Sequence, residues 1–360
     1  MSRRYVVMNE ICPECGVPQY ISTQHLWLNN GDIVNAAQST ERLNFLESEF
    51  MDPLIREIEK LVGVPIEPIV IITFQEATRV YVESLLPEGI KEMVHNGSLD
   101  PRTVADGIAA VGKLAGYGAY GYVDMRMEGG EMEFCTYRVT KPFSVPMGVA
   151  CHGADFEAIL GVDQKVRYEQ KSPDTYEVTC YPSPHPEELK RRLAPRQYQH
   201  RDGDLELERC ATCNVPKLLS EFQWVLEEGL VVNKATGRRM AITGPNQTEP
   251  IFQELEEELG EEIPRTVIKA QRVIAKSGFL PVEILENEEV LRMQLALRGL
   301  GNLRSLRVDE KGLAMCLENA CLPLVVVGSI QGLYDLRYGV DSGLEWEITP
   351  DRELNIELIG

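Results

Sequence analysis

Apolar residues recur along the chain at spacings that predict an alternation of helices and strands. Phe50, Leu54, Ile58 and Leu61 follow one another at intervals of four, four and three residues, which places them on one face of a helix that ends at Gly63. Residues 101–114 and 147–160 predict two more helices, the second one rich in small residues. We expect these helices to pack against a shared core.

The segments between the helices predict hairpins. The apolar run 26–28 leads into Asn29-Asn30-Gly31-Asp32, and Asn-Gly is a strong turn signal because both central residues must accept a positive φ. Polar and apolar residues alternate over 122–128, which predicts a strand with one solvated face, paired with 131–140. Two further strands are expected at 165–170 and 176–181.

The pattern occurs twice. Cys12 and Cys15 return as Cys210 and Cys213, at an offset of 198 residues (210 − 12 and 213 − 15). Later landmarks repeat in the same order, namely Pro87 with Pro281, Gly116 with Gly299, Pro142 with Pro323, and Gly161 with Gly339. The sequence therefore predicts a first repeat over 1–182, a linker over 183–208 and a second repeat over 209–360.

The linker is marked by composition. Pro182-Ser183-Pro184-His185-Pro186 breaks regular structure, and the basic residues Lys190, Arg191, Arg192, Arg196 and Arg201 follow. The favoured interpretation is a solvated connecting segment, and the alternative is a docking site for an acidic partner. For the whole chain we expect an α/β (α+β) fold of two homologous units with antiparallel sheets and packed helices, arranged as a pseudo-twofold intramolecular dimer.

Composition narrows the classes of function. The formal charge of −20 argues against nucleic-acid binding, which needs a positive surface. No stretch approaches the roughly 18 apolar residues of a spanning helix, so we expect no membrane insertion. The N-terminus lacks an apolar signal-peptide core, which favours a cytoplasmic location. Nine cysteines in such a chain favour metal ligation or buried thiols over a disulfide framework.

The two Cys-x-x-Cys pairs are the strongest candidate site. A structural zinc ion needs four ligands, and neither repeat has a second pair, so the pattern predicts one site made of Cys12, Cys15, Cys210 and Cys213. Cys12-Pro13-Glu14-Cys15-Gly16 resembles the knuckle turn of rubredoxins and zinc ribbons, and a tetrahedral sulfur site also admits iron. Redox-active or merely buried thiols are the alternatives.

The latter half of each repeat, residues 116–181 and 299–358, resembles the 4-vinyl reductase domain family. The resemblance lies in the order of a glycine-rich helix end, two strands, a small-residue helix such as 147–154, a glycine, and a strand containing Glu169 or Glu347. It implies an α/β domain shared with subunits of vesicle-tethering complexes, which encloses a small hydrophobic molecule and often acts as a sensor. The last hairpin, 170–174, lacks the cysteines that the family often has there.

Two classes of function follow. The favoured one is a non-enzymatic small-molecule-binding, sensor or complex-subunit protein with a structural zinc joining two repeats, which binds a small hydrophobic ligand or a protein partner. Its candidate pocket lies in the first repeat and comprises Tyr117, Tyr120, Tyr122, Phe134, Phe143, Cys151 and His152. The alternative is an enzyme that uses Cys-x-x-Cys redox or metal chemistry.

Overall fold

The computed structural model describes residues 10–128, 131–193, 200–278 and 280–360. It is a mixed α+β protein with antiparallel sheets and packed helices, as the hydrophobic pattern predicts. The chain forms two compact units. Unit 1 comprises Met1–Ile66, Gln197–Glu221 and Ile242–Gly360, and unit 2 comprises Glu67–Arg196 and Phe222–Ala241.

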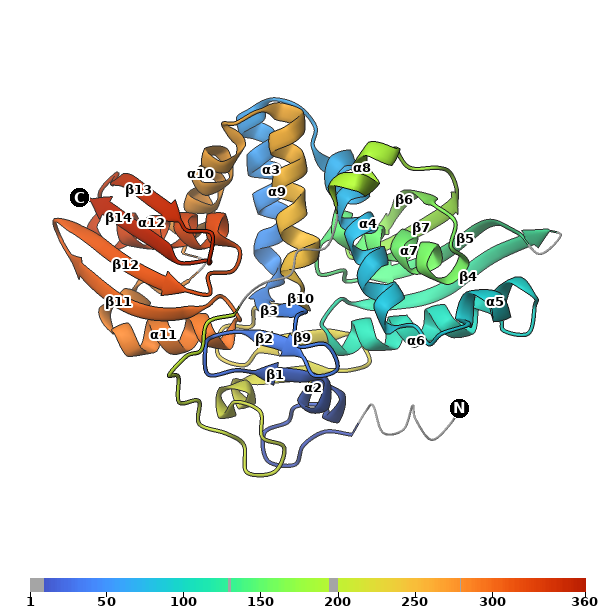
Figure 1. The fold of residues 1–360 in the computed structure, drawn as a ribbon, viewed down its shortest axis with the longest axis horizontal. Helices are drawn as coiled ribbons and strands as arrows, with labels where there is room; N and C mark the ends of the chain where they lie inside the picture. Colours follow the sequence, from blue (N-terminus) through green and yellow to red (C-terminus); the bar gives the residue numbers. More distant parts are fainter. Residues whose placement is uncertain (1–9, 129–130, 194–199, 279) are drawn as a thin grey trace. The chain divides into compact units, whose positions relative to one another are not determined.

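Unit 2 is built around a four-stranded antiparallel sheet in the order β4-β5-β7-β6. Helix α7 packs against this sheet and against α4, while α6 contacts β4 (Figure 1). The elements are α4 (Glu67–Leu85), α5 (Ile90–His95), α6 (Pro101–Leu114), β4 (Ala119–Glu128), β5 (Glu131–Thr140), α7 (Val145–Leu160), β6 (Gln164–Ser172), β7 (Thr175–Pro182), α8 (Glu187–Arg192), β8 (Phe222–Val225) and β9 (Leu230–Asn233).

Local chemistry sets the ends of the predicted helices in unit 2. Asp100 caps α6 by accepting a hydrogen bond from the N–H of Arg102, and Pro101 occupies the first helical position. Helix α7 is almost entirely buried, as its run of small and apolar residues predicts, and it ends at Gly161, whose φ of 67° suits glycine. The acidic residues Asp155 and Glu157 are therefore unusual in this helix, and Glu157 is the fully buried one.

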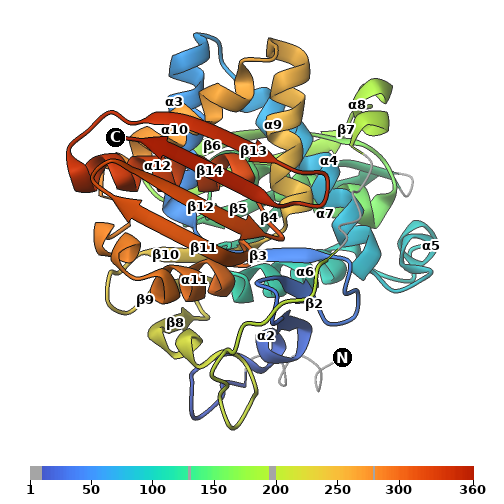
Figure 2. The same cartoon turned by 60° about the vertical axis from the view of Figure 1, so that its left-hand side comes forward.

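Unit 1 contains a second four-stranded antiparallel sheet, in the order β11-β12-β14-β13. Helix α12 covers one face of this sheet (Figure 2). The elements are α2 (Gln19–Gln24), β1 (His25–Trp27), β2 (Ile33–Asn35), β3 (Arg42–Glu47), η1 (Ser48–Phe50), α3 (Met51–Val62), η2 (Lys217–Glu221), α9 (Pro245–Leu259), α10 (Ile263–Lys276), η3 (Val282–Glu286), α11 (Glu288–Leu297), β11 (Asn302–Asp309), β12 (Gly312–Glu318), α12 (Pro323–Tyr338), β13 (Gly343–Ile348) and β14 (Leu354–Ile359). The chain passes from unit 2 to unit 1 within β10 (Arg239–Thr243).

In each unit, a hairpin tryptophan donates a hydrogen bond to the carbonyl at the end of a helix. In unit 1, Trp27 Nε1 on β1 donates to the carbonyl of Leu297 at the end of α11, at 3.0 Å. In unit 2, Trp224 Nε1 on β8 donates to the carbonyl of Leu114 at the end of α6, at 3.1 Å. The hairpin near the start of the chain thus packs on a helix near its end, and the later hairpin packs on a helix from the first half.

The compact units differ from the predicted repeats. Residues 1–182 and 209–360 each contribute to both units. The first hairpin packs in unit 1 with the four-stranded sheet of residues 209–360, and the second hairpin packs in unit 2 with the four-stranded sheet of residues 1–182. The predicted boundaries at residues 182 and 209 divide the sequence into repeats, and that division stays a prediction. The two compact units divide the chain at other residues.

Several local predictions are confirmed and some features are new. The hairpin is formed by β1 and β2, but residues 19–24 form helix α2 in front of it. In the linker, Lys190 pairs with Asp163 at 2.7 Å and Arg201 pairs with Glu353 at 2.9 Å, which favours the interpretation as a connecting segment. Arg196 lies outside the described residues. None of the helices in the described ranges combines the length and apolar character that a membrane crossing requires.

Candidate metal centre

The two cysteine turns have the same backbone structure. In the first, the N–H of Cys12 donates to the carbonyl of Val17 at 2.9 Å, and the N–H of Gly16 donates to the carbonyl of Cys12 at 2.9 Å. In the second, Cys210 and Asn214 make the equivalent bonds at 2.9 and 3.0 Å. The residue after each second cysteine has a positive φ, 79° at Gly16 and 64° at Asn214, which glycine and asparagine tolerate best.

The four sulfurs of these turns meet in unit 1. Cys12 Sγ lies 3.7 Å from Cys210 Sγ, and Cys15 Sγ lies 3.4 Å from Cys213 Sγ. All four ligand atoms fall within 4.8 Å of one another. A zinc ion with Zn–S bonds of about 2.3 Å at tetrahedral angles sets neighbouring sulfurs ~3.8 Å apart. The observed spacing therefore fits a tetrahedral metal ion, and it exceeds the roughly 2.05 Å of a disulfide.

The turns are also joined by a carboxylate. Glu14 of the first turn accepts hydrogen bonds from the second, from Thr212 Oγ1 at 2.7 Å, Thr212 N at 3.0 Å and Ala211 N at 3.2 Å. These bonds, that of the Thr212 side chain first, lower the pKa of Glu14. In return, Arg209 beside the second turn donates to the carbonyl of Trp27 at 2.7 Å. The two turns are thus held together by groups other than the sulfurs.

The electrostatics of the thiols suit a cation. Burial opposes ionisation of Cys12, but hydrogen bonds from the backbone N–H groups of Cys15 and Glu14, together with those from the Cys15 and Cys213 thiols, outweigh it and lower the pKa of the Cys12 thiol to about 7. Burial raises the pKa of Cys15 and raises that of Cys213 to about 11. Four buried or half-buried thiolates would repel one another, so the full ligand set is stable only around a positive ion.

His25 lies in the same unit but is not in the four-sulfur group. Its Nδ1 lies 3.1 Å from the carbonyl of Ile21, the ring is buried, and burial lowers its pKa to about 4. The remaining thiols, Cys135, Cys151, Cys180, Cys316 and Cys321, are not in the four-sulfur group.

The predicted pocket residues fall into separate places within unit 2. Tyr117 stacks on Phe143 with ring centroids 4.3 Å apart, and Tyr120, whose hydroxyl donates to the carbonyl of Gly148 at 3.1 Å, lies near the same end of α7. There, burial raises the pKa of the Cys151 thiol well above its ordinary value. These side chains form one aromatic cluster.

The other predicted pocket residues lie elsewhere. His152 Nε2 lies 3.1 Å from the carbonyl of Cys135, and its ring packs against Tyr137 at 5.1 Å. Tyr122 meets Tyr137 edge-on at 6.0 Å. Phe134 is half-buried, and strand alternation puts it on the face of β5 opposite Cys135. Cys151 and His152 therefore do not form a nucleophile and base pair.

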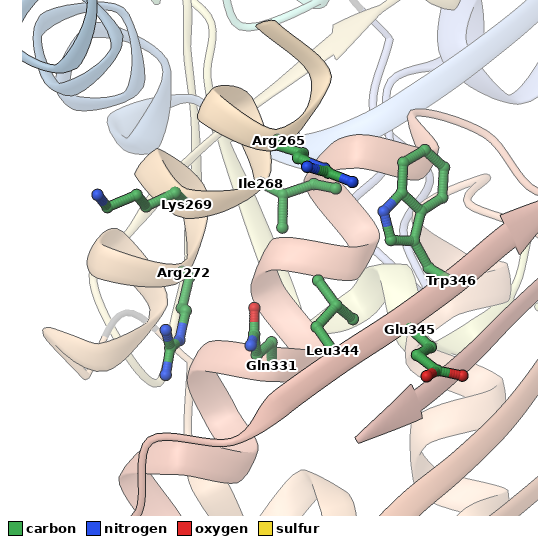
Figure 3. A pocket seen from close by; sticks show the side chains of 8 residues that line it. All are labelled: Arg265, Ile268, Lys269, Arg272, Gln331, Leu344, Glu345 and Trp346. Carbon is green, nitrogen blue, oxygen red and sulfur yellow. The ribbon is translucent and has the colours of Figure 1, made fainter. Parts of the chain in front are cut away.

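Unit 1 holds a groove that the sequence did not predict. It has a volume of about 510 Å³ and lies between helix α10 and strand β13 (Figure 3). Arg265, Lys269 and Arg272 line the α10 side, and Leu344, Glu345 and Trp346 line the opposite side. Arg272 is already paired with Asp335 and Asp341. The groove combines cations with an indole ring, a lining suited to an anionic molecule with an apolar part.

A second group with metal-ligand chemistry lies in unit 2. Glu76, Glu157 and His185 are buried, and one ligand atom of each falls within 4.8 Å of the others. Sequence reasoning missed this group because His185 lies in the proline-rich linker. The available signal was Glu157, an acidic residue within the otherwise apolar stretch 156–160.

Comparison with protein-family models, with curated proteins and with solved structures finds no match to this chain.

Proposed function

We propose that the protein is a non-enzymatic binding protein, a sensor or complex subunit, built from two repeats and held by a structural zinc ion at Cys12, Cys15, Cys210 and Cys213. The observation that carries this proposal is the approach of both cysteine pairs to within tetrahedral sulfur spacing, 3.4 and 3.7 Å, although 198 residues separate them. The ion closes a site for which each turn supplies half the ligands.

Matching contacts in the two units support the duplication. Gly31 of the first hairpin approaches Gly301, where a Cβ would lie 2.2 Å from its backbone. Gly229 of the second hairpin approaches Gly118, where a Cβ would lie 2.1 Å from its backbone. The hairpin glycines are 198 residues apart (229 − 31) and their partners 183 (301 − 118), the same offsets as the cysteines and the glycine turns. In this proposal the two repeats have exchanged their hairpins about a pseudo-twofold axis.

A structural role for the cysteines is favoured over the redox alternative by their local setting. A redox Cys-x-x-Cys pair usually begins a helix, whose positive end stabilises the thiolate. Helix α2 begins at Gln19, after Cys15, and the backbone N–H groups that lower the pKa of Cys12 belong to the turn itself. Bonds of this kind are typical of a metal knuckle.

The small-molecule half of the proposal rests on the resemblance to vinyl reductase domains and on two candidate places. One is the aromatic cluster of Tyr117, Tyr120 and Phe143 in unit 2, and the other is the groove of unit 1 beside Trp346. The first suits an apolar ligand, and the second suits a ligand that also carries negative charge.

Metal analysis of protein purified without added metal tests the zinc site. We expect zinc in the native chain, loss of one zinc in Cys12→Ser and Cys210→Ser, and no loss in the control Cys316→Ser, whose half-exposed thiol lies outside the four-sulfur group. Native chain without zinc, but with a reversible dithiol and disulfide couple at Cys12 and Cys15, would instead establish the redox alternative.

Native mass spectrometry tests the binding role. We expect a retained organic molecule on freshly purified protein, lost in Tyr117→Ala if it occupies the aromatic cluster and in Trp346→Ala if it occupies the groove. Protein that carries metal alone and no organic molecule from any preparation would contradict a small-molecule sensor.

A further inference from the structure

Three polar side chains from distant parts of the sequence meet in the interior of unit 2. Glu76 lies on α4, Glu157 lies on α7, and His185 follows β7. The three residues are 2 %, 0 % and 9 % exposed, so all three are withdrawn from water. Arg79 offsets the charge of the Glu76 carboxylate, and His185 is the titratable partner of Glu157.

The hydrogen bonds around Glu157 leave one of its oxygens without a partner. Oε1 accepts from Gln75 Nε2 at 2.7 Å and from the N–H of Gln164 at 2.8 Å, and it contacts His185 Nε2. Oε2 is buried and has no hydrogen-bond partner. An unsatisfied carboxylate oxygen in the interior costs on the order of 1–3 kcal/mol or more, so a cation bound to this carboxylate would offset a real cost.

Neighbouring groups fix the three side chains in place. The N–H of His185 donates to Asp163 Oδ2 at 2.9 Å, and the N–H of Ser183 donates to the carbonyl of Asp163 at 2.9 Å, so the segment that carries the imidazole is anchored. Glu76 is held by Arg79, which in turn pairs with Glu83 at 2.9 Å. Supporting bonds of this kind orient the first ligands of metal sites.

The corresponding place in unit 1 lacks these features. Asp335 stands on α12 where Glu157 stands on α7, four residues before Gly339 and Gly161 respectively. Its carboxylate accepts from the N–H and hydroxyl of Ser342 and is paired with Arg272. The permanently charged guanidinium of Arg272 therefore lies beside the Asp335 carboxylate. In unit 2 an imidazole, which can ligate a metal, takes the place of the guanidinium.

We propose that Glu76, Glu157 and His185 bind a divalent transition-metal ion in the interior of unit 2. Two carboxylates and one imidazole suit Mn²⁺, Fe²⁺ or Zn²⁺, whereas the four thiolates of unit 1 suit zinc. On binding, His185 Nε2 directs its lone pair at the ion, and a proton shared with Glu157 leaves to solvent. The ion offsets the charge of the carboxylates and ties the segment after β7 to α4 and α7. This site shares no residue with the cysteine site, so either can exist without the other.

Titration with Mn²⁺ of protein that holds one zinc ion per chain, followed by the electron paramagnetic resonance signal of free Mn²⁺, tests the proposal. Zinc fills the cysteine site first, and Mn²⁺ competes poorly for thiolates. We expect one Mn²⁺ bound per chain, with affinity at least tenfold weaker in Glu157→Gln and His185→Gln. The control His95→Gln, an exposed histidine on α5, should bind as the native chain does.

A measurement on the native chain covers the case in which a buried variant fails to fold. In protein labelled with ¹⁵N-histidine, bound Mn²⁺ should show hyperfine coupling to one imidazole nitrogen. No bound Mn²⁺ in the native chain, bound Mn²⁺ without such coupling, or unchanged affinity in folded His185→Gln would overturn the site. In that event His185 and Glu157 are a buried ion pair only.

Discussion

Individual residues carry the chemistry of this protein, and the cysteines were the easiest to find. A thiol pair at Cys-x-x-Cys spacing is rare, and its return at Cys210 and Cys213 predicted the four-sulfur group that the structure brings together. Glu157 and His185 were missed, because an acid in a mostly apolar helix and a histidine between prolines gain meaning only when the fold brings them together. Spacing along the chain detects ligands that lie close in sequence or that recur in a repeat, and these residues do neither.

His152 gives a prediction for pH dependence. Burial lowers its pKa to about 4, although the carbonyl of Cys135 accepts a hydrogen bond from the ring. Below pH ~6.5 the unfolded chain gains a proton on this residue that the folded chain does not take up. The neutral His152 ring therefore makes its full contribution to the free energy of unfolding above pH ~6.5. About 3 kcal/mol of that contribution is lost when the pH falls to 4.

His152→Gln should remove this term. Chemical denaturation of the native chain and the variant at pH 7 and pH 4 should show that the difference in their free energies of unfolding narrows by about 3 kcal/mol as the pH falls. The control His95→Gln should keep the same difference from the native chain at both pH values. A constant difference for His152→Gln would mean that the folded protein protonates this ring.

Among the elements, helices with clear apolar periodicity were predicted closely, and short buried strands were not. Helix α6 has the predicted bounds, Pro101–Leu114. Strand β3 was missed because it is buried throughout but contains Arg42, Asn44 and Glu47. Asn44 donates to the carbonyl of Gly299 at 3.0 Å, and Arg42 donates to that of Asn319 at 2.8 Å. These polar side chains can be buried because they hydrogen-bond to backbone carbonyls that lie more than 250 residues away in the sequence.

The docking of the second hairpin can be tested at a single glycine. At Gly229, φ is +66°, and a Cβ would lie 2.1 Å from the carbonyl oxygen of Gly118. At Gly237 in the same segment, φ is +72° and no atom lies within 4 Å of a Cβ. Both alanine substitutions strain the backbone by about 1 kcal/mol, but only Gly229→Ala also forces the hairpin from its partner, which costs a further 1–3 kcal/mol or so.

Thermal or chemical unfolding of the two variants should therefore separate them by at least ~1 kcal/mol, with Gly229→Ala the less stable. Equal losses would show that the hairpin does not pack closely on the turn at Gly118.

At the scale of the whole molecule, the sequence predicted the repeated order of landmarks but not which segments pack together. An offset identifies the matching residues, here Cys12 with Cys210, and it is the same whether each hairpin packs on its own repeat or on the other. The choice is made by contacts such as that of Trp27 with Leu297, which no pattern within one segment encodes.

Removal of the proposed zinc ion has a calculable effect on the chain. A ligand that binds only the folded state adds about 3 kcal/mol of stability at a free concentration of 100 times its Kd. We expect a chelator to lower the free energy of unfolding by about that amount, and added zinc to restore it. Stability that does not respond to chelation in zinc-containing protein would place the metal outside the four-cysteine site.

Separation of the chain into two pieces tests the exchanged hairpins. Pieces 1–193 and 194–360, expressed together, should copurify as a complex, because unit 1 needs residues 1–66 beside 242–360 and unit 2 needs residues 222–241 beside 67–196. Each piece expressed alone should be insoluble or unfolded, as judged by circular dichroism and yield. Two pieces that fold separately would mean that each hairpin can pack on its own segment.

The docking of Trp27 also has a consequence for synthesis on the ribosome. Its helix partner lies in the segment 242–360, so after the first 66 residues at least 175 more must be translated before Trp27 can begin to dock on that segment. At roughly 5–20 residues per second, this wait lasts about 10 to 35 seconds. During that time Trp27 lacks its helix partner, so we expect the nascent chain to gain from a chaperone that shields short apolar segments until translation ends.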